Sequence, residues 1–164
     1  SPAEFLATNG AGLRMPGLYS WWVDSTGARD LTAGLGQIVE PGLIYAGLAG
    51  ATRSRSGRKS TNTIWGRIGG MHLGGRYNFS TFRLSLGAIL AAADNHSTID
   101  EERLTRWMHQ HLRVIAVPVD DADTLDALET GILDALDPPF NLDKRPKNEL
   151  RTRLSAVRRR HNQR

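Results

Sequence analysis

Three segments of the chain have the pattern of β-strands, because each is short, rich in aromatic or β-branched residues and bounded by Gly, Pro or Asp. They are residues 17–23, 42–48 and 112–119. Side chains alternate across a strand, so the first segment places Tyr19 and Trp21 on one face. The second segment likewise places Leu43 and Tyr45 on one face. If these two strands pair, Tyr19 and Tyr45 lie on the same side of a sheet. Pro118 favours the end or the edge of the sheet for the third segment.

Four further segments have apolar residues at helical spacing: residues 80–92, 98–111, about 121–136 and about 148–160. Thr98 and Glu101 match a capping box that would start the second of these helices. Asp120 or Asp123 is expected to cap the third helix. The Pro138-Pro139 pair is expected to end it.

The remaining segments are less regular. Residues 62–68 resemble the start of a helix, although nearby glycines weaken the helix propensity. Residues 28–41 predict a long loop or partial strand, and residues 49–60 predict a loop rich in Gly, Ser and Arg. The order β-β-α-α-α-β-α-α indicates an α+β fold or a small layered α/β fold. The length of 164 residues is that of a single domain, spanning residues 1–164.

The composition excludes several classes of protein. The chain has no cysteine, which rules out disulfide scaffolds, thiolate zinc sites and cysteine nucleophiles. No apolar run approaches the roughly 18 residues that a membrane span requires. Residues 1–10 contain an acid and no basic residue, so they do not resemble a signal peptide. We therefore expect a cytoplasmic, intracellular protein with no membrane partner.

Charge is strongly segregated along the chain. Residues 41–93 sum to +7 and contain no acid, residues 94–143 sum to −9, and residues 144–164 sum to +8. Of the 21 basic residues, 18 are arginine, whose planar guanidinium grips phosphate with two hydrogen bonds. The two basic blocks predict nucleic-acid binding. A solvated face with a basic tail is the alternative that charge alone leaves open.

One carboxylate interrupts the apolar stripe of the predicted 121–136 helix. Glu129 follows Leu125 by four residues and precedes Ile132 by three, so it lies on the apolar face. A buried carboxylate needs a cation, a hydrogen-bond network or water, because an uncompensated buried charge costs several kcal/mol. An ion pair with a neighbouring arginine, or a position at the edge of the stripe that reaches solvent, would satisfy it. A metal ligand or a catalytic acid is the alternative.

The segment around residue 67 holds two further candidates. Arg67 has no acid nearby in the sequence, so phosphate is a reasonable partner, although an ordinary surface arginine fits equally well. His72 could act as a general base, because imidazole titrates near neutral pH. It could equally be a polar residue at a helix end. The His109-x-His111 pair is discounted as a metal site, because helical residues two apart do not face each other.

Together these residues resemble the GIY-YIG nuclease superfamily. Gly17-Leu-Tyr19 and Tyr45-Ala-Gly47 are similar to its paired tripeptides, each with a tolerated middle substitution. Downstream, the other superfamily residues follow in the expected order: Arg67, His72, Glu129 and Asn141. The resemblance runs from about Gly17 to Asn141, which is most of the chain.

The resemblance implies a small three-stranded antiparallel sheet flanked by helices. It implies a core over about residues 16–142 and an extra basic C-terminal helix and tail over about residues 144–164. The segment between Tyr19 and Tyr45 is long, so the resemblance implies an insertion that loops out between their strands. One of the two tyrosines would help to deprotonate the attacking water. Arg67 would neutralise the scissile phosphate as charge builds on its oxygens.

The resemblance also implies roles for the downstream residues. Glu129 would hold one divalent metal ion, Mg²⁺ or Mn²⁺, because such ions prefer oxygen ligands. Asn141 would support Tyr19, the phosphate or the residues around the metal. His72 would assist the base. In many members a histidine or tyrosine lies one helical turn after the arginine, whereas here Met71 holds that place and His72 follows it.

The sequence therefore predicts a metal-dependent endonuclease that hydrolyses phosphodiester bonds, with DNA as the expected partner and RNA as an alternative. A non-catalytic nucleic-acid-binding module on the same fold and a toxin nuclease are the competing interpretations. The cations expected to contact nucleic acid are Arg53, Arg55, Arg58, Lys59, Arg76 and Arg83.

Overall fold

The computed structural model describes residues 1–51 and 56–161, and it has a three-stranded antiparallel sheet at its centre. The strands are β1 (Gly17–Val23), β2 (Gly42–Ala49) and β3 (Leu112–Pro118), in the order β2-β1-β3. All three predicted strands are confirmed, and β3 is an edge strand, as Pro118 suggests. The α+β class and the antiparallel sheet are confirmed as well.

A β-bulge changes one detail of the predicted strand faces. Tyr19 pairs with Gly47 and Trp21 with Tyr45, but the register then shifts so that Trp22 pairs with Leu43. Because the bulge inserts a residue into β2, Leu43 lies opposite Trp22 and not on the face that carries Tyr45. The prediction that Leu43 and Tyr45 share a face was therefore wrong. The shared face of Tyr19 and Tyr45 is confirmed, since their ring centroids are 6.4 Å apart.

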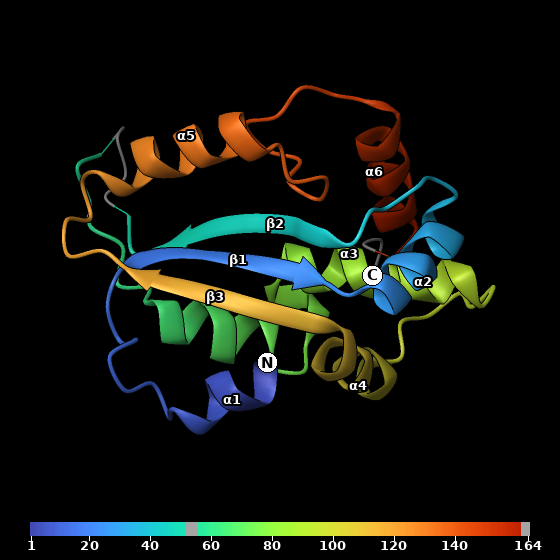
Figure 1. The fold of residues 1–164 in the computed structure, drawn as a ribbon, viewed down its shortest axis with the longest axis horizontal. Coiled ribbons are helices and arrows are strands. Elements are labelled where there is room, and N and C mark those ends of the chain that lie inside the picture. The colour runs from blue at the N-terminus through green and yellow to red at the C-terminus, as the bar shows by residue number, and fades with distance from the viewer. Residues whose placement is uncertain (52–55, 162–164) are drawn as a thin grey trace.

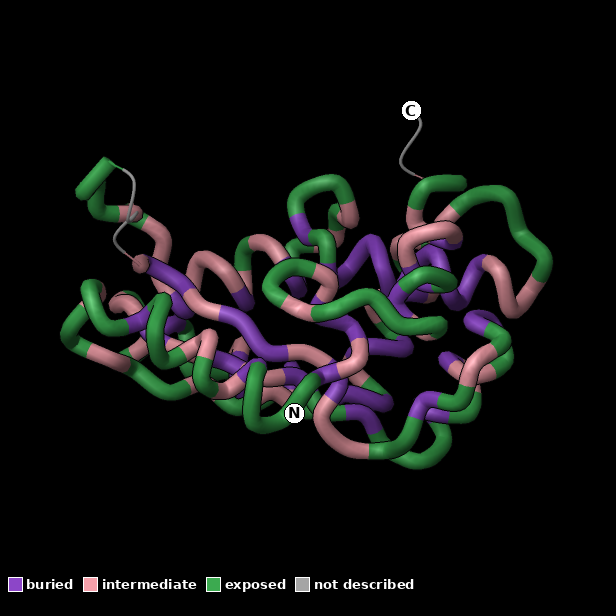
Figure 2. Tube along the Cα trace, turned by 90° about the horizontal axis from the view of Figure 1, so that it is seen from above, coloured by how far each residue is buried: buried purple, intermediate pink, exposed green. Residues whose placement is uncertain are grey.

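Helices surround the sheet (Figure 1). They are α1 (Pro2–Ala7), α2 (Ser25–Leu35), the π-helix η1 (Gly66–His72), the 3-10 helix η2 (Tyr77–Phe79), α3 (Thr81–Ala93), α4 (Glu101–His111), α5 (Leu125–Leu136) and α6 (Glu149–His161). Helix α3 supplies the centre of the core, where Phe82 stacks on Trp21 of β1 at 5.3 Å between ring centroids. Helices α2 and α6 pack on α3. The buried segments lie at the centre of the molecule and the exposed ones around it (Figure 2).

The segment between β1 and β2 is a helix, so the predicted loop or partial strand over residues 28–41 was wrong. Helix α2 begins after Asp24, whose carboxylate accepts a hydrogen bond from the Gly27 amide at 2.7 Å. It ends at Gly36, which adopts the left-handed conformation with φ 69°. Leu31 and Leu35 are fully buried. Their burial in the tertiary structure stabilises a helix whose own propensity is low.

Two predicted helix caps also differ from the structure. Helix α4 is capped by Asp100, which accepts from the Arg103 amide at 2.9 Å, and Thr98 and Glu101 do not form the predicted capping box. Helix α5 begins after Thr124 without a side-chain cap, so neither Asp120 nor Asp123 caps it. The predicted helices 80–92 and 148–160 are confirmed as α3 and α6.

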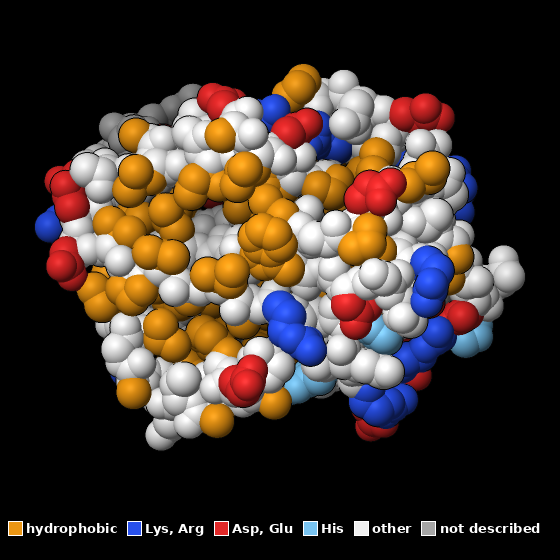
Figure 3. Space-filling model, viewed as in Figure 1, with side chains coloured by type: hydrophobic (Ala, Val, Ile, Leu, Met, Phe, Trp, Pro, Cys, Tyr) orange, Lys and Arg blue, Asp and Glu red, His pale blue; other side chains and the backbone are white. Residues whose placement is uncertain are grey.

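The face of the sheet turned away from α3 is partly open. Figure 3 shows hydrophobic side chains gathered over this face and over α5, around a hollow. The hollow is an apolar groove of about 290 Å³, lined in part by Leu18, Trp22, Leu43, Ile115, Val117 and Leu136. Helix α5 borders this groove with Ile132 and Leu136. No helix in the described part of the chain is long and apolar enough to cross a membrane.

Candidate active site

Two glycines allow the strands to place Tyr19 in the site. A Cβ atom on Gly47 would lie 2.6 Å from the Tyr19 hydroxyl oxygen, so only glycine leaves room for that hydroxyl. A Cβ atom on Gly17 would lie 2.3 Å from the Val117 carbonyl oxygen of β3. The two tripeptides therefore have a physical reason for their glycines, which is close approach between neighbouring strands.

The Tyr19 hydroxyl belongs to a buried chain of hydrogen bonds. His72 Nε2 lies 2.8 Å from the Tyr19 hydroxyl, and His72 Nδ1 lies 2.6 Å from Ser80 Oγ. Ser80 Oγ also accepts a hydrogen bond from the Arg83 amide at 3.0 Å, which caps α3. Ser80 is a site residue that the sequence reasoning missed, and its position as the N-cap of α3 is the signal that could have found it.

The π-helix η1 explains the spacing between Arg67 and His72. Its hydrogen bonds connect residues five apart, as the Leu73 amide shows by donating to the Ile68 carbonyl at 2.8 Å. A residue five positions after Arg67 therefore takes the place that the fourth residue would have in an α-helix. The glycine-rich stretch thus brings His72, and not Met71, to Tyr19. Met71 Sδ instead lies 3.4 Å from Arg67 Nη1.

Aromatic packing keeps His72 neutral. The imidazole ring lies 5.2–6.2 Å from the ring centroids of Tyr19, Trp21, Tyr45 and Phe82. Burial among these rings lowers the pKa of His72 from its ordinary 6.5 to about 3, and the nearby guanidinium groups of Arg67 and Arg83 act in the same direction. His72 is therefore uncharged at neutral pH.

The low pKa of His72 predicts a stability that falls in acid. Between pH 6.5 and about 3, the unfolded chain binds a proton on His72 that the folded chain does not bind. The free energy of unfolding should therefore decrease by up to about 1.4 kcal/mol per pH unit as the pH falls through this window. Urea unfolding of the parent and of His72→Gln at pH 7, 6, 5 and 4 measures this contribution. The slope of the free energy of unfolding against pH should be smaller in His72→Gln, by the equivalent of about one bound proton. Equal slopes in the two proteins would contradict the low pKa of His72.

Arg67 presents a cation without a carboxylate partner. Its Nε atom is buried and has no hydrogen-bond partner, and among the described residues no carboxylate forms an ion pair with its guanidinium. Burying an unpaired cationic group is costly unless an anion completes it. The position therefore fits an anionic ligand such as a phosphate.

The tyrosines, Arg67 and Glu129 act on one another electrostatically. Burial raises the pKa of Tyr19 well above its ordinary value of 10, and the Tyr45 hydroxyl adds to the rise. Burial likewise raises the pKa of Tyr45. Arg67 lowers both values and Glu129 raises both. The charges of Arg67 and Glu129 therefore act in opposite directions on the ionisation of both phenols.

Glu129 lies on α5 and borders two hollows of the described structure. It lines a cavity of about 290 Å³ with Tyr45 and Asn141, and it also borders the apolar groove next to Tyr19. Its side chain is 15% exposed, and its Oε2 accepts a hydrogen bond from Lys144 Nζ at 2.9 Å. Of the two interpretations of this stripe carboxylate, the ion pair is thus present, although with a lysine and not an arginine.

The residues at Glu129 fit a magnesium ion. Mg²⁺ usually takes one or two carboxylates and completes its shell with water and substrate phosphate. Glu129 supplies one carboxylate at the wall of the cavity, and Asp143 lines the same cavity. Among residues 1–51 and 56–161, no group of three or more His, Asp or Glu side chains could hold a metal by itself. An ion here would therefore need oxygen ligands from the substrate or water.

Comparison with protein families identifies the family to which these residues belong. Residues 17–160 match the family described as the GIY-YIG catalytic domain. The chain belongs to the GIY-YIG nuclease family. It is therefore an enzyme of the hydrolase class that cleaves phosphodiester bonds in nucleic acid, and the family generally uses a divalent metal ion. Comparison with curated proteins and with solved structures finds no match.

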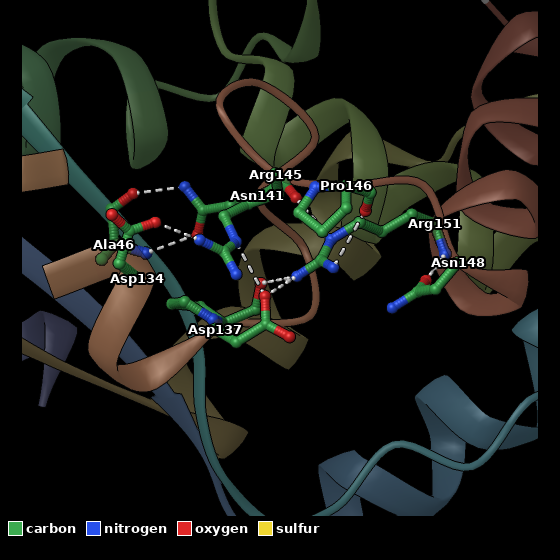
Figure 4. A network of polar contacts seen from close by, with 9 residues as sticks. Ala46, Asp134, Asp137, Asn141, Arg145, Pro146, Asn148 and Arg151 are labelled. Atoms are coloured by element: carbon green, nitrogen blue, oxygen red, sulfur yellow. Dashed lines mark hydrogen bonds and ion pairs between the residues drawn. The ribbon is translucent and has the colours of Figure 1, made fainter. Parts of the chain in front are cut away.

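In this GIY-YIG domain, Asn141 acts on the backbone of β2. Its Oδ1 accepts from the Ala46 amide at 3.0 Å, and its Nδ2 donates to the Ala46 carbonyl at 2.7 Å (Figure 4). Both ends of the amide are thereby used, and the segment after α5 is fixed to the free edge of β2. Asn141 also lines the cavity that Tyr45 and Glu129 line.

The cations predicted to contact nucleic acid fall into three groups. Arg58, Lys59 and Arg76 are exposed on the surface of the GIY-YIG domain. Arg53 and Arg55 lie outside the described residues.

The sixth predicted contact, Arg83, is wrong, because its side chain is fully buried. Its guanidinium pairs with Glu101 at 2.8 Å and donates to Thr105 Oγ1 at 2.6 Å and to the His72 carbonyl at 3.2 Å. Arg83 thus ties α3, α4 and η1 together behind the site. Glu101, which the sequence placed in a capping box, is its partner.

Proposed function

We propose that this domain is a metal-dependent endonuclease whose substrate is DNA, with Tyr19, Tyr45, Arg67, His72, Glu129 and Asn141 forming the catalytic site. The observation that carries the proposal is a buried Tyr19–His72 pair packed beside Tyr45, which lines one cavity with Glu129 and Asn141. The unpaired guanidinium of Arg67 acts electrostatically on both tyrosines. These are the parts that phosphodiester hydrolysis needs: charge neutralisation, a proton acceptor for water and a cation-binding carboxylate.

The hydrogen bonds of Ser80 assign the proton on His72. Ser80 Oγ already accepts from the Arg83 amide, and within the described residues His72 Nδ1 is the only acceptor bonded to the serine hydroxyl. Ser80 therefore donates to Nδ1, which leaves the imidazole proton on Nε2. His72 Nε2 then donates to the Tyr19 oxygen at 2.8 Å. The low pKa of His72 agrees with a group that donates and does not accept a proton.

This arrangement supports Tyr19 as the proton acceptor. A hydrogen bond donated to a phenol oxygen stabilises its ionised form, and Arg67 does the same through its charge. Because burial raises the pKa of Tyr19, its hydroxyl must first release its proton to solvent. The phenolate oxygen then takes a proton from the attacking water, whose oxygen forms the new bond to phosphorus as the bond to the leaving oxygen breaks. Arg67 stabilises the negative charge that builds on the phosphate oxygens. Tyr45, the nearest phenol, orients the water.

Glu129 would hold the divalent ion, Mg²⁺ or Mn²⁺. When bound, such an ion neutralises charge on the phosphate and on the leaving oxygen. Lys144 Nζ holds Glu129 Oε2, so an ion bound to that oxygen would displace the ammonium group.

The proposal is tested by incubating the protein with supercoiled plasmid, single-stranded DNA and RNA, each in Mg²⁺ or in EDTA. We expect the plasmid to be nicked or linearised in Mg²⁺ and to stay intact in EDTA. A preparation of Glu129→Ala, purified in parallel, controls for contaminating nuclease. Cleavage of RNA alone would overturn the DNA assignment. Binding without cleavage of any substrate in Mg²⁺ or Mn²⁺ would favour the non-catalytic module.

A further inference from the structure

A second cleft lies beside the catalytic cavity, against α6. It encloses about 410 Å³, and Leu142 and Arg158 line both it and the catalytic cavity, so the two adjoin. Thr152 and Ser155 contribute hydroxyl groups to its wall. No carboxylate among the described residues lines it, and its charged lining consists of Arg145, Lys147, Arg151, Arg158 and Arg159.

Two of these five cations are already neutralised. Arg145 pairs with Asp134 at 2.7 Å and with Asp137 at 2.8 Å, and Arg151 pairs with Asp137 at 2.6 Å (Figure 4). These pairs fasten the segment after α5 to α6 and shape the cleft wall. The other three cations, Lys147, Arg158 and Arg159, form no ion pair with any described residue. The cleft therefore has a net positive charge that the protein does not balance.

Arg158 lies at the junction of this cleft and the catalytic cavity. Its side chain is half-buried, and burial lowers the pKa of its guanidinium, while Asp143 and Tyr45 act in the opposite direction. Arg158 and Tyr45 line the same cavity, so the guanidinium lies at the edge of the proposed catalytic site. A guanidinium stays charged at neutral pH, so its partial removal from water is costly unless an anion approaches it.

We propose that the cleft against α6 binds the phosphodiester backbone of the substrate strand beside the cleavage point, with Arg158 binding the phosphate next to the scissile one. The proposal rests on the proposed function and assigns a path to its substrate. A nucleic-acid strand fits the cleft because it presents repeated anions, whereas a single small anion would satisfy only one of the three unpaired cations. The Thr152 and Ser155 hydroxyls add donors of the kind that commonly contact phosphate oxygens.

The test compares two arginines of the same helix. Arg158→Gln removes the cation at the junction, and Arg160→Gln removes an exposed cation of α6 that lines neither the cleft nor the cavity. Binding of a fluorescein-labelled DNA duplex is measured by anisotropy in EDTA, where the strand stays intact, at a series of salt concentrations. We expect Arg158→Gln to weaken binding about tenfold or more at ~0.1 M salt. It should also reduce the slope of log affinity against log salt by about 0.9, the value for one phosphate contact on a duplex.

Two further variants keep the result interpretable. Arg158→Lys retains the charge and should restore the salt slope while recovering only part of the affinity, because lysine lacks the bidentate fork. Lys147→Gln removes an exposed cation from the cleft wall, where no packing is lost. It should also weaken DNA binding more than Arg160→Gln does. Equal losses of DNA affinity in Arg158→Gln, Lys147→Gln and Arg160→Gln would overturn the assignment of the cleft as a binding site for the substrate strand.

The outcome separates this inference from the proposed function. If the parent protein cuts DNA in Mg²⁺ but the variants of the cleft behave like Arg160→Gln, only the path along α6 is wrong. If the parent neither binds nor cuts DNA, the proposed function itself fails.

Discussion

Replacing Glu129 by alanine should abolish DNA cleavage while leaving the fold and DNA binding intact. Glu129 and Asp143 are the carboxylates that line the cavity with Tyr45 and Asn141, and Glu129 is the one proposed to hold the ion. Charge stabilisation by a bound divalent ion contributes several kcal/mol to a reaction of this kind. Each 1.36 kcal/mol corresponds to tenfold in rate, so we expect a loss of about 10³-fold or more. Single-turnover cleavage at saturating Mg²⁺ measures the loss, and anisotropy with labelled duplex measures binding.

The structure supplies a matched control for this variant. Lys144 Nζ binds Asp126 at 2.7 Å as well as Glu129 at 2.9 Å, so Asp126→Ala removes the other partner of the same lysine without touching the cavity. Asp126→Ala should cut DNA within a few-fold of the parent rate. Both variants should change the free energy of unfolding by no more than about 1 kcal/mol, because these ion pairs reach solvent. A folded Glu129→Ala protein that cuts at the parental rate would refute the assignment of Glu129.

Replacing Tyr19 by phenylalanine should cost both catalysis and stability. Loss of a positioned proton-transfer group lowers the rate by roughly 10²–10⁴-fold. The same change leaves His72 Nε2 without its partner in a buried site, which should lower the free energy of unfolding by about 1–3 kcal/mol. Tyr45→Phe should lose a similar factor in rate with little change in stability. Melting temperature and single-turnover cleavage are measured side by side.

Two comparisons sharpen the tyrosine prediction. Tyr77→Phe, in η2 and outside the cavity, makes the same chemical change and should leave the rate unchanged. Arg67→Ala should lose as much rate as Tyr19→Phe or more, with weaker DNA binding as a second effect, because it removes the charge that faces the phosphate. If Tyr19→Phe and Tyr45→Phe both melt lower yet cut at the parental rate, the two phenols are structural and the catalytic site must be assigned elsewhere.

The amino-acid sequence by itself determined the features that depend on local periodicity. Alternation along residues 17–23 and 42–48 put Tyr19 and Tyr45 on one side of the sheet, and the structure confirms their shared face. The helical spacing of residues 121–136 put Glu129 among apolar side chains, and it lines the cavity there. The order of the motif residues gave the family, which the family match confirms over residues 17–160.

Only the tertiary structure decided which side chains meet and which charges are neutralised. The π-helical register of η1 brings His72 to Tyr19, which a count of four residues per turn does not predict. The sequence predicts Arg83 as a nucleic-acid contact, whereas the fold pairs it with Glu101 on another helix. The basic block over residues 144–164 predicts nucleic-acid contacts for the whole tail, but only the fold shows that Arg158 lines a cavity with Tyr45. The physical reason is the same in each case: periodicity is a property of neighbouring residues, whereas burial and ion pairing depend on groups that the fold brings together from distant parts of the chain.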